Sequence, residues 1–260
     1  MGEILFIGLG LFDEKDITIK GMEEARSCDV LFAEFYTSKL VGTSKERIEA
    51  LLGKRIEILG REEVEKGDVI LEVAKSKRVG FLTGGDPMTA TTHVELRLRA
   101  EKMGISTRIV YGVSILTAAA SLVGLQSYKI GRTTSLPFPH EKFFPTSPYE
   151  AIDENLRMGL HTLLLLDIDE EGNEMDARDA LAYLLEMEEK EQKKAFTEDT
   201  VACVVSEAGS PEAVARCERV KNLMRMDFGK PLHCLIVPGD LHFMEKEALI
   251  VFAGAPEDIG

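Results

Sequence analysis

Short apolar runs alternate with amphipathic segments along the first 111 residues, and this alternation constrains the fold more than any other feature of the chain. The apolar runs have the length of buried strands, and the segments between them carry the caps and the spacing of helices. Thr43-x-x-Glu46, for example, is a capping box that predicts a helix ending at Gly53. We expect strands at residues 3–7, 30–35, 55–59, 78–83 and 107–111. Strands that alternate with helices predict βαβ units around a mostly parallel sheet.

The second half of the chain follows a different pattern. A small-residue helix is expected at 114–123 and a charged helix at 176–194. Further strands are expected at 161–168, 200–206 and 232–237, and a last helix at 243–252. We therefore predict an α/β protein of two domains, an N-terminal α/β domain at 1–111 and a C-terminal α/β domain at 112–260.

An irregular stretch, residues 133–149, lies between these elements and contains four prolines. It also carries Phe138, Phe143, Phe144 and Tyr149. Long irregular segments in compact domains are often functional, and the prolines limit the freedom of this one. One interpretation is an aromatic surface that a macromolecular partner covers. The equally weighted alternative is that the aromatic rings pack into the protein's own core or into a dimer interface.

The charge balance disfavours one class of partner. The chain has 31 basic and 45 acidic residues, for a net charge of −14, and such a surface repels phosphate backbones. We therefore expect no nucleic-acid partner. The hydrophobic fraction of 45% and the charged fraction of 29% are those of an ordinary globular protein, which excludes a disordered or collagen-like chain.

The sequence predicts a cytoplasmic protein without a membrane span. The four cysteines form no C-x-x-C pair and are expected to be reduced thiols. No basic residue precedes the apolar run at 4–12, so it does not have the form of a signal peptide. The uncharged stretch at 109–128 contains several Gly, Ser, Thr and Gln residues. A strand followed by a buried helix explains that stretch better than a transmembrane helix.

Glycines follow the first predicted strand as Gly8-Leu9-Gly10. Glycines at such a position let the backbone turn sharply and approach a ligand closely. A dinucleotide fingerprint would need a third glycine where this chain has Asp13, although Glu34 stands near the end of the second strand as that fingerprint requires. An NAD-dependent oxidoreductase is therefore disfavoured but stays open, as does a plain tight turn.

A second glycine loop, Gly84-Gly85-Asp86-Pro87, follows the strand ending at Thr83. Ligands of parallel sheets bind at the carboxyl ends of strands. The Asp86 carboxylate could accept hydrogen bonds from an ammonium group or face a cationic centre. The alternative is a turn in which the Asp86 side chain bonds its own backbone. We favour the binding loop over the structural turn.

Other catalytic motifs are incomplete. Gly112-Val113-Ser114-Ile115 resembles a nucleophile elbow, but that motif needs glycine where Leu116 stands, so Ser114 is expected to be a helix N-cap whose backbone lines a pocket. The histidines are scattered and His140-Glu141 lacks the second histidine of a zinc protease, so we expect no metal site. His233, next to a buried strand, is the histidine most worth following.

Several stretches together resemble one family. They are Phe6–Leu11, Ala33–Ser38, Gly85–Pro87 with Ala90–His93, Phe144–Ser147, Gly159–Ile168 and Ile236–His242. They are similar to the diphthine synthases, which belong to the tetrapyrrole-methylase class of S-adenosylmethionine-dependent methyltransferases. The resemblance covers nearly the whole chain. The glycine and Gly-Asp-Pro motifs are common to the class, whereas the blocks that contain His161 and His242 are more specific to the diphthine synthases.

The resemblance implies a fold, a reaction and an assembly. The fold would be two α/β domains of the tetrapyrrole-methylase type with the active-site cleft between them, and the assembly a homodimer. The reaction would be repeated N-methylation of the amino-carboxypropyl histidine of elongation factor 2, a step of diphthamide biosynthesis. S-adenosylmethionine would be the methyl donor and S-adenosylhomocysteine the product. The alternatives are a tetrapyrrole methyltransferase of the same fold and a non-enzymatic nucleotide-binding module.

The resemblance also carries site residues over to this chain. The family's cofactor contacts fall on Leu9, Asp86, Thr89, Ser114, Ile115, Leu166, Ala208 and His233. Thr89 stands where relatives commonly have an aliphatic residue, and Gly84 replaces a common proline. We assign no catalytic side chain, because methyl transfer from a sulfonium is an in-line displacement that needs alignment more than covalent help.

Overall fold

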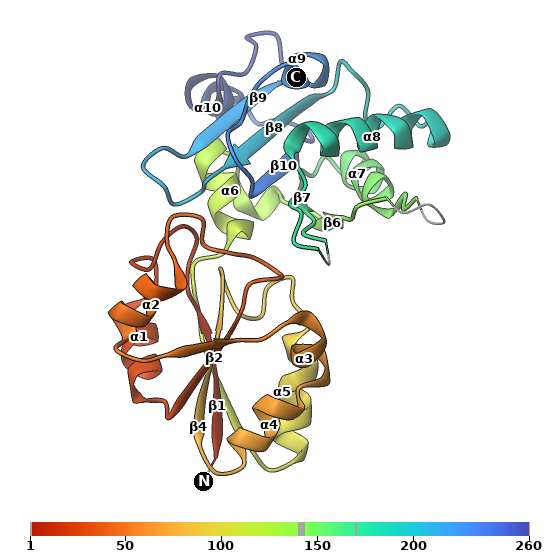
Figure 1. Cartoon of the computed structure of the whole chain (residues 1–260). Coiled ribbons are helices and arrows are strands. Elements are labelled where there is room, and N and C mark those ends of the chain that lie inside the picture. Colours follow the sequence, from red (N-terminus) through yellow and green to blue (C-terminus); the bar gives the residue numbers. More distant parts are fainter. Residues whose placement is uncertain (1, 140–143, 170, 260) are drawn as a thin grey trace. The chain divides into compact units, whose positions relative to one another are not determined.

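The computed structural model describes residues 2–139, 144–169 and 171–259. Contacts divide the chain into two compact units, Met1–Ile115 and Leu116–Gly260. The predicted domain boundary at Gly112 stays a prediction. Each unit contains one five-stranded sheet, so the expected α/β class with two sheets is confirmed (Figure 1). Within the described ranges, no helix has the length and apolar character to cross a membrane.

The sheet of unit 1 is entirely parallel, as the alternation of strands and helices predicts. Its strand order is β3-β2-β4-β1-β5, which places β1 in contact with both β4 and β5. The strands are β1 (Glu3–Gly8), β2 (Val30–Glu34), β3 (Ile56–Ile58), β4 (Arg78–Thr83) and β5 (Ser106–Val110). The carboxyl ends of β4, β1 and β5 therefore meet at one edge, where the two predicted glycine loops begin.

Helices cover both faces of this sheet, which is why its strands are almost continuously apolar. The helices are α1 (Ile19–Ser27), α2 (Lys45–Leu52), α3 (Arg61–Lys66), α4 (Asp68–Ala74) and α5 (His93–Lys102). Figure 1 shows α1 and α2 on one face and α3, α4 and α5 on the other. Ala25 and Ile48 join the core of the first face, and Ile70 and Leu96 join that of the second.

The start of α2 corrects one prediction. The N-cap is Ser44, whose side chain accepts from the Arg47 amide, rather than Thr43. Thr43 does not cap because its hydroxyl donates to the Glu14 carboxylate at 2.5 Å. The end of the helix is as expected, since Gly53 is the C-cap with a φ of +68°.

The sheet of unit 2 is mostly antiparallel, with strand order β6-β7-β10-β8-β9. Its strands are β6 (Thr134–Leu136), β7 (Thr162–Leu166), β8 (Val201–Ser206), β9 (Val214–Arg219) and β10 (His233–Val237). The helical segments are α6 (Ile115–Val123), which begins at the last residue of unit 1, and η1 (Ser127–Lys129), α7 (Ser147–Arg157), α8 (Ala177–Glu191), α9 (Val220–Leu223) and α10 (Phe243–Ala253). Only the pair β6–β7 is parallel.

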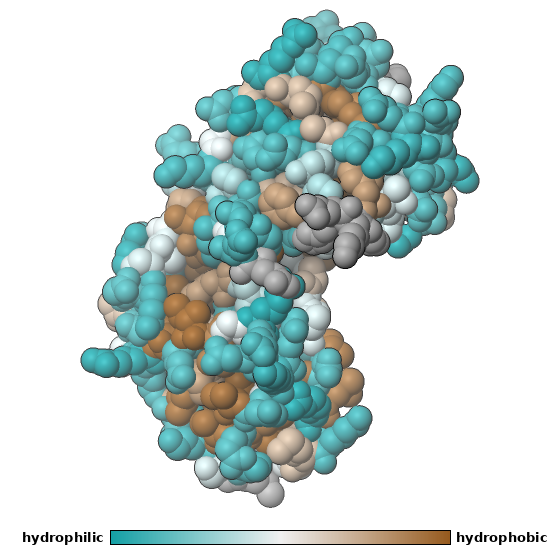
Figure 2. Space-filling model, turned by 45° about the vertical axis from the view of Figure 1, so that its right-hand side comes forward, coloured by the Kyte–Doolittle hydropathy of each residue, from teal (hydrophilic) through white to brown (hydrophobic). Residues whose placement is uncertain are grey.

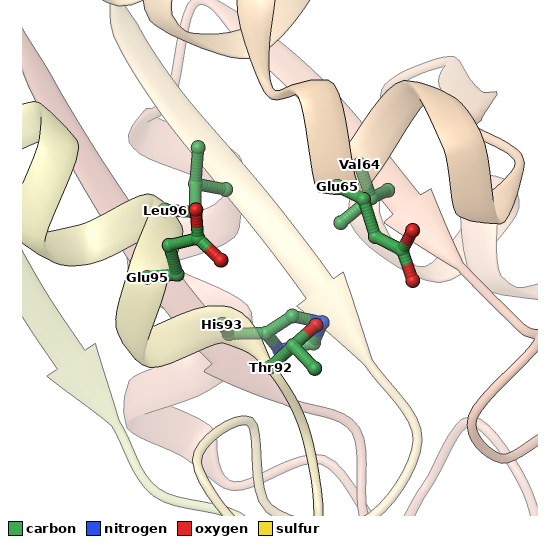
Figure 3. Close-up of a pocket in the computed structure, with 6 residues that line it drawn as sticks. All are labelled: Val64, Glu65, Thr92, His93, Glu95 and Leu96. Atoms are coloured by element: carbon green, nitrogen blue, oxygen red, sulfur yellow. The ribbon is translucent and has the colours of Figure 1, made fainter.

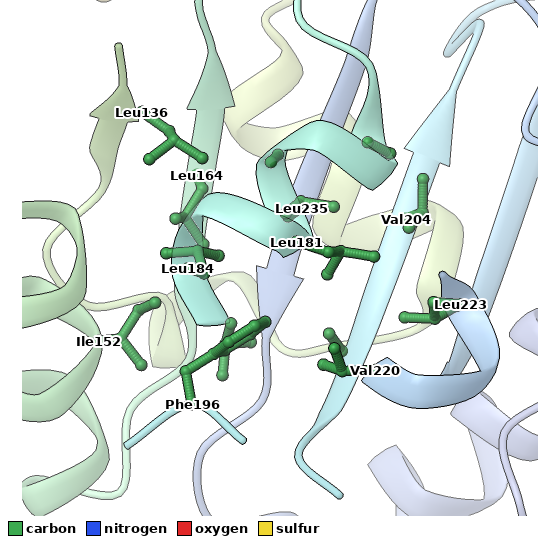
Figure 4. Close-up of a cluster of buried hydrophobic side chains, with 14 of the residues drawn as sticks. Leu136, Ile152, Leu164, Leu181, Leu184, Phe196, Val204, Val220, Leu223 and Leu235 are labelled. Carbon is green, nitrogen blue, oxygen red and sulfur yellow. The ribbon is translucent and has the colours of Figure 1, made fainter. Parts of the chain in front are cut away.

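The core of unit 2 lies between one face of this sheet and helices α7 and α8. Leu164, Val204 and Leu235 from the sheet meet Ile152 of α7 and Leu181 of α8 (Figure 4). Phe196, which follows α8, is fully buried in the same cluster.

The described aromatic residues of the stretch 133–149 pack into this core or against it. Tyr149 is fully buried, and Phe138 and Phe144 pack against the same cluster. Phe143 lies outside the described residues. The predicted aromatic docking surface is therefore wrong for the three described rings, and the alternative, burial in the protein's own core, is correct. The physical reason is that α7 begins at Ser147, so Tyr149 lies on the apolar face of a helix that packs on the sheet.

Candidate functional site

Three loops of unit 1 come into backbone contact at the carboxyl ends of β1, β4 and β5. A Cβ atom added to Gly112 would lie 2.2 Å from the Gly85 carbonyl oxygen, and one added to Gly8 would lie 2.5 Å from the same atom. Gly10 and Gly85 exchange two backbone hydrogen bonds, of 2.6 and 3.3 Å. Glycine is therefore required because no side chain fits between these segments. The result is a compact edge of closely packed backbone, which we call the unit 1 loop edge (residues 8–10, 84–89 and 112–115).

The candidate residues of unit 1 all belong to this edge. Leu9 is buried, and its amide donates to the Thr83 carbonyl at 2.9 Å. The Asp86 Oδ1 atom accepts from the Met88 amide at 3.0 Å and from the Thr89 hydroxyl at 3.3 Å. Asp86 therefore makes the turn that was given as the alternative to a binding loop, and a carboxylate with about four lone-pair sites can accept further bonds. Ser114 and Ile115 stand where the edge continues into α6.

The candidate residues of unit 2 come together at one end of the other sheet. Leu166 ends β7, and the register pairs its neighbour Leu165 with Cys234 of β10. His233, which begins β10, pairs with Ser206 of β8, two residues before Ala208. The turn that contains Ala208 is tightly shaped, since Glu207 has a φ of +50°. Three residues far apart in the sequence thus share one sheet end, which we call the unit 2 sheet end.

The protonation of His233 follows from its contacts. Its Nδ1 atom accepts a hydrogen bond of 3.1 Å from the Ala177 amide at the start of α8. Burial lowers the pKa of the ring, which favours the neutral form. A neutral imidazole that accepts at Nδ1 carries its hydrogen on Nε2. Nε2 is buried, and the nearby backbone carbonyl groups of Phe228 and Lys230 accept from the ring, which raises its pKa and partly opposes the effect of burial.

The opposite end of the unit 2 sheet holds a saturated polar cluster. Glu245 accepts from His161 Nε2 at 3.0 Å and from the Gln126 amide at 2.9 Å with one oxygen. Its other oxygen accepts from Lys129 Nζ at 2.6 Å and from the His242 amide at 2.9 Å. Burial opposes ionisation, but these donors lower the Glu245 pKa to about 2. All acceptor sites of Glu245 are used, so its contacts with His161 and His242 are structural.

His93, one of the scattered histidines of the sequence, lies behind the unit 1 loop edge, a place that the sequence pattern does not predict. Its ring is buried, and Nδ1 lies 2.8 Å from the Pro87 carbonyl oxygen. Its Nε2 atom lies 3.7 Å from an oxygen of the equally buried Glu34. Figure 3 shows His93 lining a small pocket between α3 and α5. The signal that could have found the pair is a histidine six residues after the proline of the second glycine loop.

No group of three or more His, Cys, Asp or Glu side chains in the described part of the chain is arranged to hold a metal ion. What the described residues do provide is a glycine-lined edge with a carboxylate in unit 1 and a buried N–H donor in unit 2. Taken separately, the unit 1 carboxylate can contact a positively charged group, and the unit 2 donor can contact a hydrogen-bond acceptor.

Comparisons with known proteins agree on one family. The model of the Tetrapyrrole (Corrin/Porphyrin) Methylases matches residues 3–220. A diphthine synthase of Methanosarcina barkeri is 48% identical over 258 residues, covering 97% of each chain. A diphthine synthase of Methanocaldococcus jannaschii is 48% identical over 250 residues, covering 95% of this chain and 97% of that protein. A crystal structure of diphthine synthase superposes with a TM-score of 0.89 at 40% identity, covering 98% of this chain and 97% of the other.

Proposed function

Because the chain belongs to the diphthine synthase family within the tetrapyrrole methylases, we propose that it methylates elongation factor 2. The acceptor is the amino nitrogen of the amino-carboxypropyl histidine, which is methylated repeatedly. The methyl donor is S-adenosylmethionine, as in the rest of the family, and S-adenosylhomocysteine is the product. The observation that carries the proposal is 48% identity over 97% of both chains to a diphthine synthase.

We propose that the unit 1 loop edge contacts the cofactor through Leu9, Asp86, Thr89, Ser114 and Ile115. No side chain covers the backbone at Gly85 and Gly112, which are only partly buried, so a ligand can approach it there. S-adenosylmethionine carries a sulfonium and an ammonium charge, and the Asp86 carboxylate complements positive charge. The residues present therefore fit the group, although Asp86 also stabilises its own turn.

We propose that Leu166, Ala208 and His233 at the unit 2 sheet end are further cofactor contacts. The supporting observation is that these residues, which are distant in the sequence, share one end of the sheet with the buried His233 ring. The predicted cleft between the two domains stays a prediction.

For methyl transfer from a sulfonium, the main task of the protein is to align the methyl donor with the acceptor amine. Bound S-adenosylmethionine supplies an electrophilic methyl group. The residues of the chain hold the donor in line with the acceptor amine and keep water away, which lowers the entropic part of the barrier. The amine must be neutral when it attacks. We assign no general base, because the proton can leave to water once the nitrogen has been methylated.

The decisive assay mixes the enzyme, methyl-labelled S-adenosylmethionine and elongation factor 2 that carries the amino-carboxypropyl histidine. We expect label on the elongation factor and none when the acceptor histidine is replaced. Label on a tetrapyrrole but never on the elongation factor would contradict the proposal and favour the tetrapyrrole methyltransferase.

We propose that the protein is a homodimer in the cytoplasm. Apolar side chains gather in patches on the surface (Figure 2), and α10 exposes Phe243, Val251 and Phe252 to more than half of their extent. Contiguous exposed apolar surface of this kind is typical of subunit interfaces. The four cysteines are free thiols, in keeping with a reducing compartment. Light scattering should give a dimer mass at micromolar concentration, and a monomer mass throughout would contradict the proposal.

A further inference from the structure

Two buried ionisable side chains, Glu34 and His93, stand directly behind the unit 1 loop edge. Glu34 ends β2 and is fully buried. One of its oxygens accepts from the Tyr36 and Thr37 amides at 3.1 Å each, and the other accepts from the Thr37 hydroxyl at 2.5 Å. His93 begins α5 and is packed edge-on against Phe81, with 4.9 Å between the ring centroids. Both side chains are therefore held in place by several contacts.

The facing atoms of the pair, His93 Nε2 and a Glu34 oxygen, have a hydrogen between them only when one of the two groups is protonated. The Pro87 carbonyl can only accept, so the His93 Nδ1 atom that faces it at 2.8 Å carries a hydrogen. A neutral ring then presents a bare Nε2 to the Glu34 oxygen 3.7 Å away, and two bare acceptors repel. Burial raises the pKa of Glu34 and lowers that of His93, so neither isolated charge is favoured. One further proton between the two groups makes their contact attractive.

The pair supports the Asp86 loop from two sides. His93 holds the Pro87 carbonyl, which also accepts from the Thr91 hydroxyl at 3.1 Å. Glu34 fixes the turn that leads to Ser38, whose carbonyl oxygen lies 3.1 Å from the position of a Cβ atom on Gly84. The backbone between Pro87 and His93 is strained, since Ala90 has a φ of +53°. Strain of this kind persists only where the surroundings hold the chain firmly.

We propose that Glu34 and His93 are positioning residues that keep the Asp86 loop in the geometry that binds the methyl donor. This proposal rests on the proposed function, because it assumes that the loop contacts S-adenosylmethionine. Neither side chain touches the donor. They act through the Pro87 carbonyl and the turn before Ser38, and the shared proton makes the two supports one unit.

The test compares His93→Leu with a matched variant, His161→Leu, in the full-length protein. His161 is also a buried histidine paired with a glutamate, but it lies at the far end of the unit 2 sheet from Leu166. The dissociation constant for S-adenosylmethionine is measured by calorimetry and the melting temperature by circular dichroism. Both variants should melt earlier than the wild type. Only His93→Leu should also weaken binding, by about tenfold or more, whereas His161→Leu should stay within about twofold of the wild type.

A rescue variant separates the hydrogen bond from the ring. His93→Asn keeps an N–H near the Nδ1 position and should recover most of the affinity that His93→Leu loses. Glu34→Gln supplies an N–H toward His93 in place of the shared proton and should bind nearly as the wild type does, whereas Glu34→Leu should not. Wild-type affinity in folded His93→Leu, or equal loss in His161→Leu, would overturn the proposal.

If His93→Leu does not fold, a milder variant can test the proposal. Thr37→Val is nearly isosteric and removes only the hydroxyl bond to Glu34. It should weaken binding severalfold, and unchanged affinity would overturn the proposal. If the wild type itself binds no S-adenosylmethionine, the proposed function fails instead, so the two failures are distinguishable.

Discussion

Single residues at the unit 1 loop edge combine structural and binding roles. Asp86 is half-buried and stabilises its own turn through Oδ1, so its replacement removes both a local bond and a charge. The glycines act differently, because their contribution is the absence of a side chain. These two kinds of residue call for different variants.

Replacing Asp86 by alanine should weaken S-adenosylmethionine binding without unfolding the chain. A hydrogen bond to a charged group contributes about 1.5–3 kcal/mol, which corresponds to roughly tenfold or more in the dissociation constant. Asp86→Asn keeps the oxygen that accepts within the turn and removes the negative charge. Its effect on affinity therefore measures the electrostatic contribution of Asp86 to binding. Calorimetry and thermal melting check both variants. A low melting temperature with normal affinity would mean that Asp86 is structural only.

Gly112→Ala should damage the unit 1 loop edge itself. Its Cβ atom would lie 2.2 Å from the Gly85 carbonyl oxygen, so the two loops must separate. Such overpacking costs about 1–3 kcal/mol of unfolding free energy, and donor binding should weaken in parallel. Gly60→Ala is the control, because its φ is −75° and the nearest atom to an added Cβ is 3.6 Å away. Urea denaturation of Gly112→Ala identical to that of the wild type would contradict the steric argument.

At the scale of elements, unit 2 depends on one polar and one apolar cluster. Glu245 at the start of α10 ties this helix to β7 through His161 and to η1 through Lys129. Phe196 fills the core between the sheet and the helices α7 and α8. Each cluster joins segments that no local interaction would hold together.

Acid should destabilise unit 2 through Glu245. Its folded pKa is about 2 against an ordinary 4.5, so the unfolded chain takes up the proton first as the pH falls. The contribution of the carboxylate is therefore complete above pH 4.5 and is lost toward pH 2, and it amounts to about 3 kcal/mol. Glu245→Gln should be less stable than the wild type at pH 6. Its free energy of unfolding should fall less than that of the wild type as the pH is lowered. Urea unfolding between pH 3 and pH 6 checks this, and parallel curves for the two proteins would refute it.

Truncating Phe196 should open the unit 2 core. The side chain is fully buried, and Phe→Ala at such a position costs about 3–5 kcal/mol of unfolding free energy. Tyr128→Ala is the control, since that ring is 79% exposed and its loss should change stability by about 0.5 kcal/mol or less. Chemical denaturation measures both. Similar losses in the two variants would show that the Phe196 site collapses without a cavity.

For the whole molecule, the dominant property is a net charge of −14. A field of this sign attracts a substrate with basic patches and raises the rate of encounter. Added salt should therefore lower kcat/KM for the elongation factor at saturating S-adenosylmethionine, with kcat nearly unchanged. Steady-state kinetics across a series of salt concentrations would reveal this, and a kcat/KM independent of salt would exclude electrostatic steering.

The sequence alone determined the features that depend on local chemistry. The strands of the first sheet, the C-cap at Gly53 and the two glycine loops follow from side-chain period and from backbone freedom, which are properties of short segments. The resemblance of several such segments was sufficient to identify the family. The short strand β6 and the hairpin strand β9 were not predicted, because their residues carry weak local signals and are stabilised by packing on their neighbours. Helix α7 was not predicted because the prolines of residues 133–149 indicate irregular structure, although Pro148 stands in the first turn of the helix, where proline is tolerated.

Only the tertiary structure decided which distant side chains meet. His161 and Glu245 are 84 residues apart in the sequence, and their contact depends on how β7 and α10 pack. Tyr149 could have faced a partner, but the sheet of unit 2 offered its ring an apolar surface. Glu34 and His93 face each other at 3.7 Å only because β2 and α5 bury both groups side by side. Burial and proximity of this kind arise from the packing of whole elements, which no short stretch of sequence records.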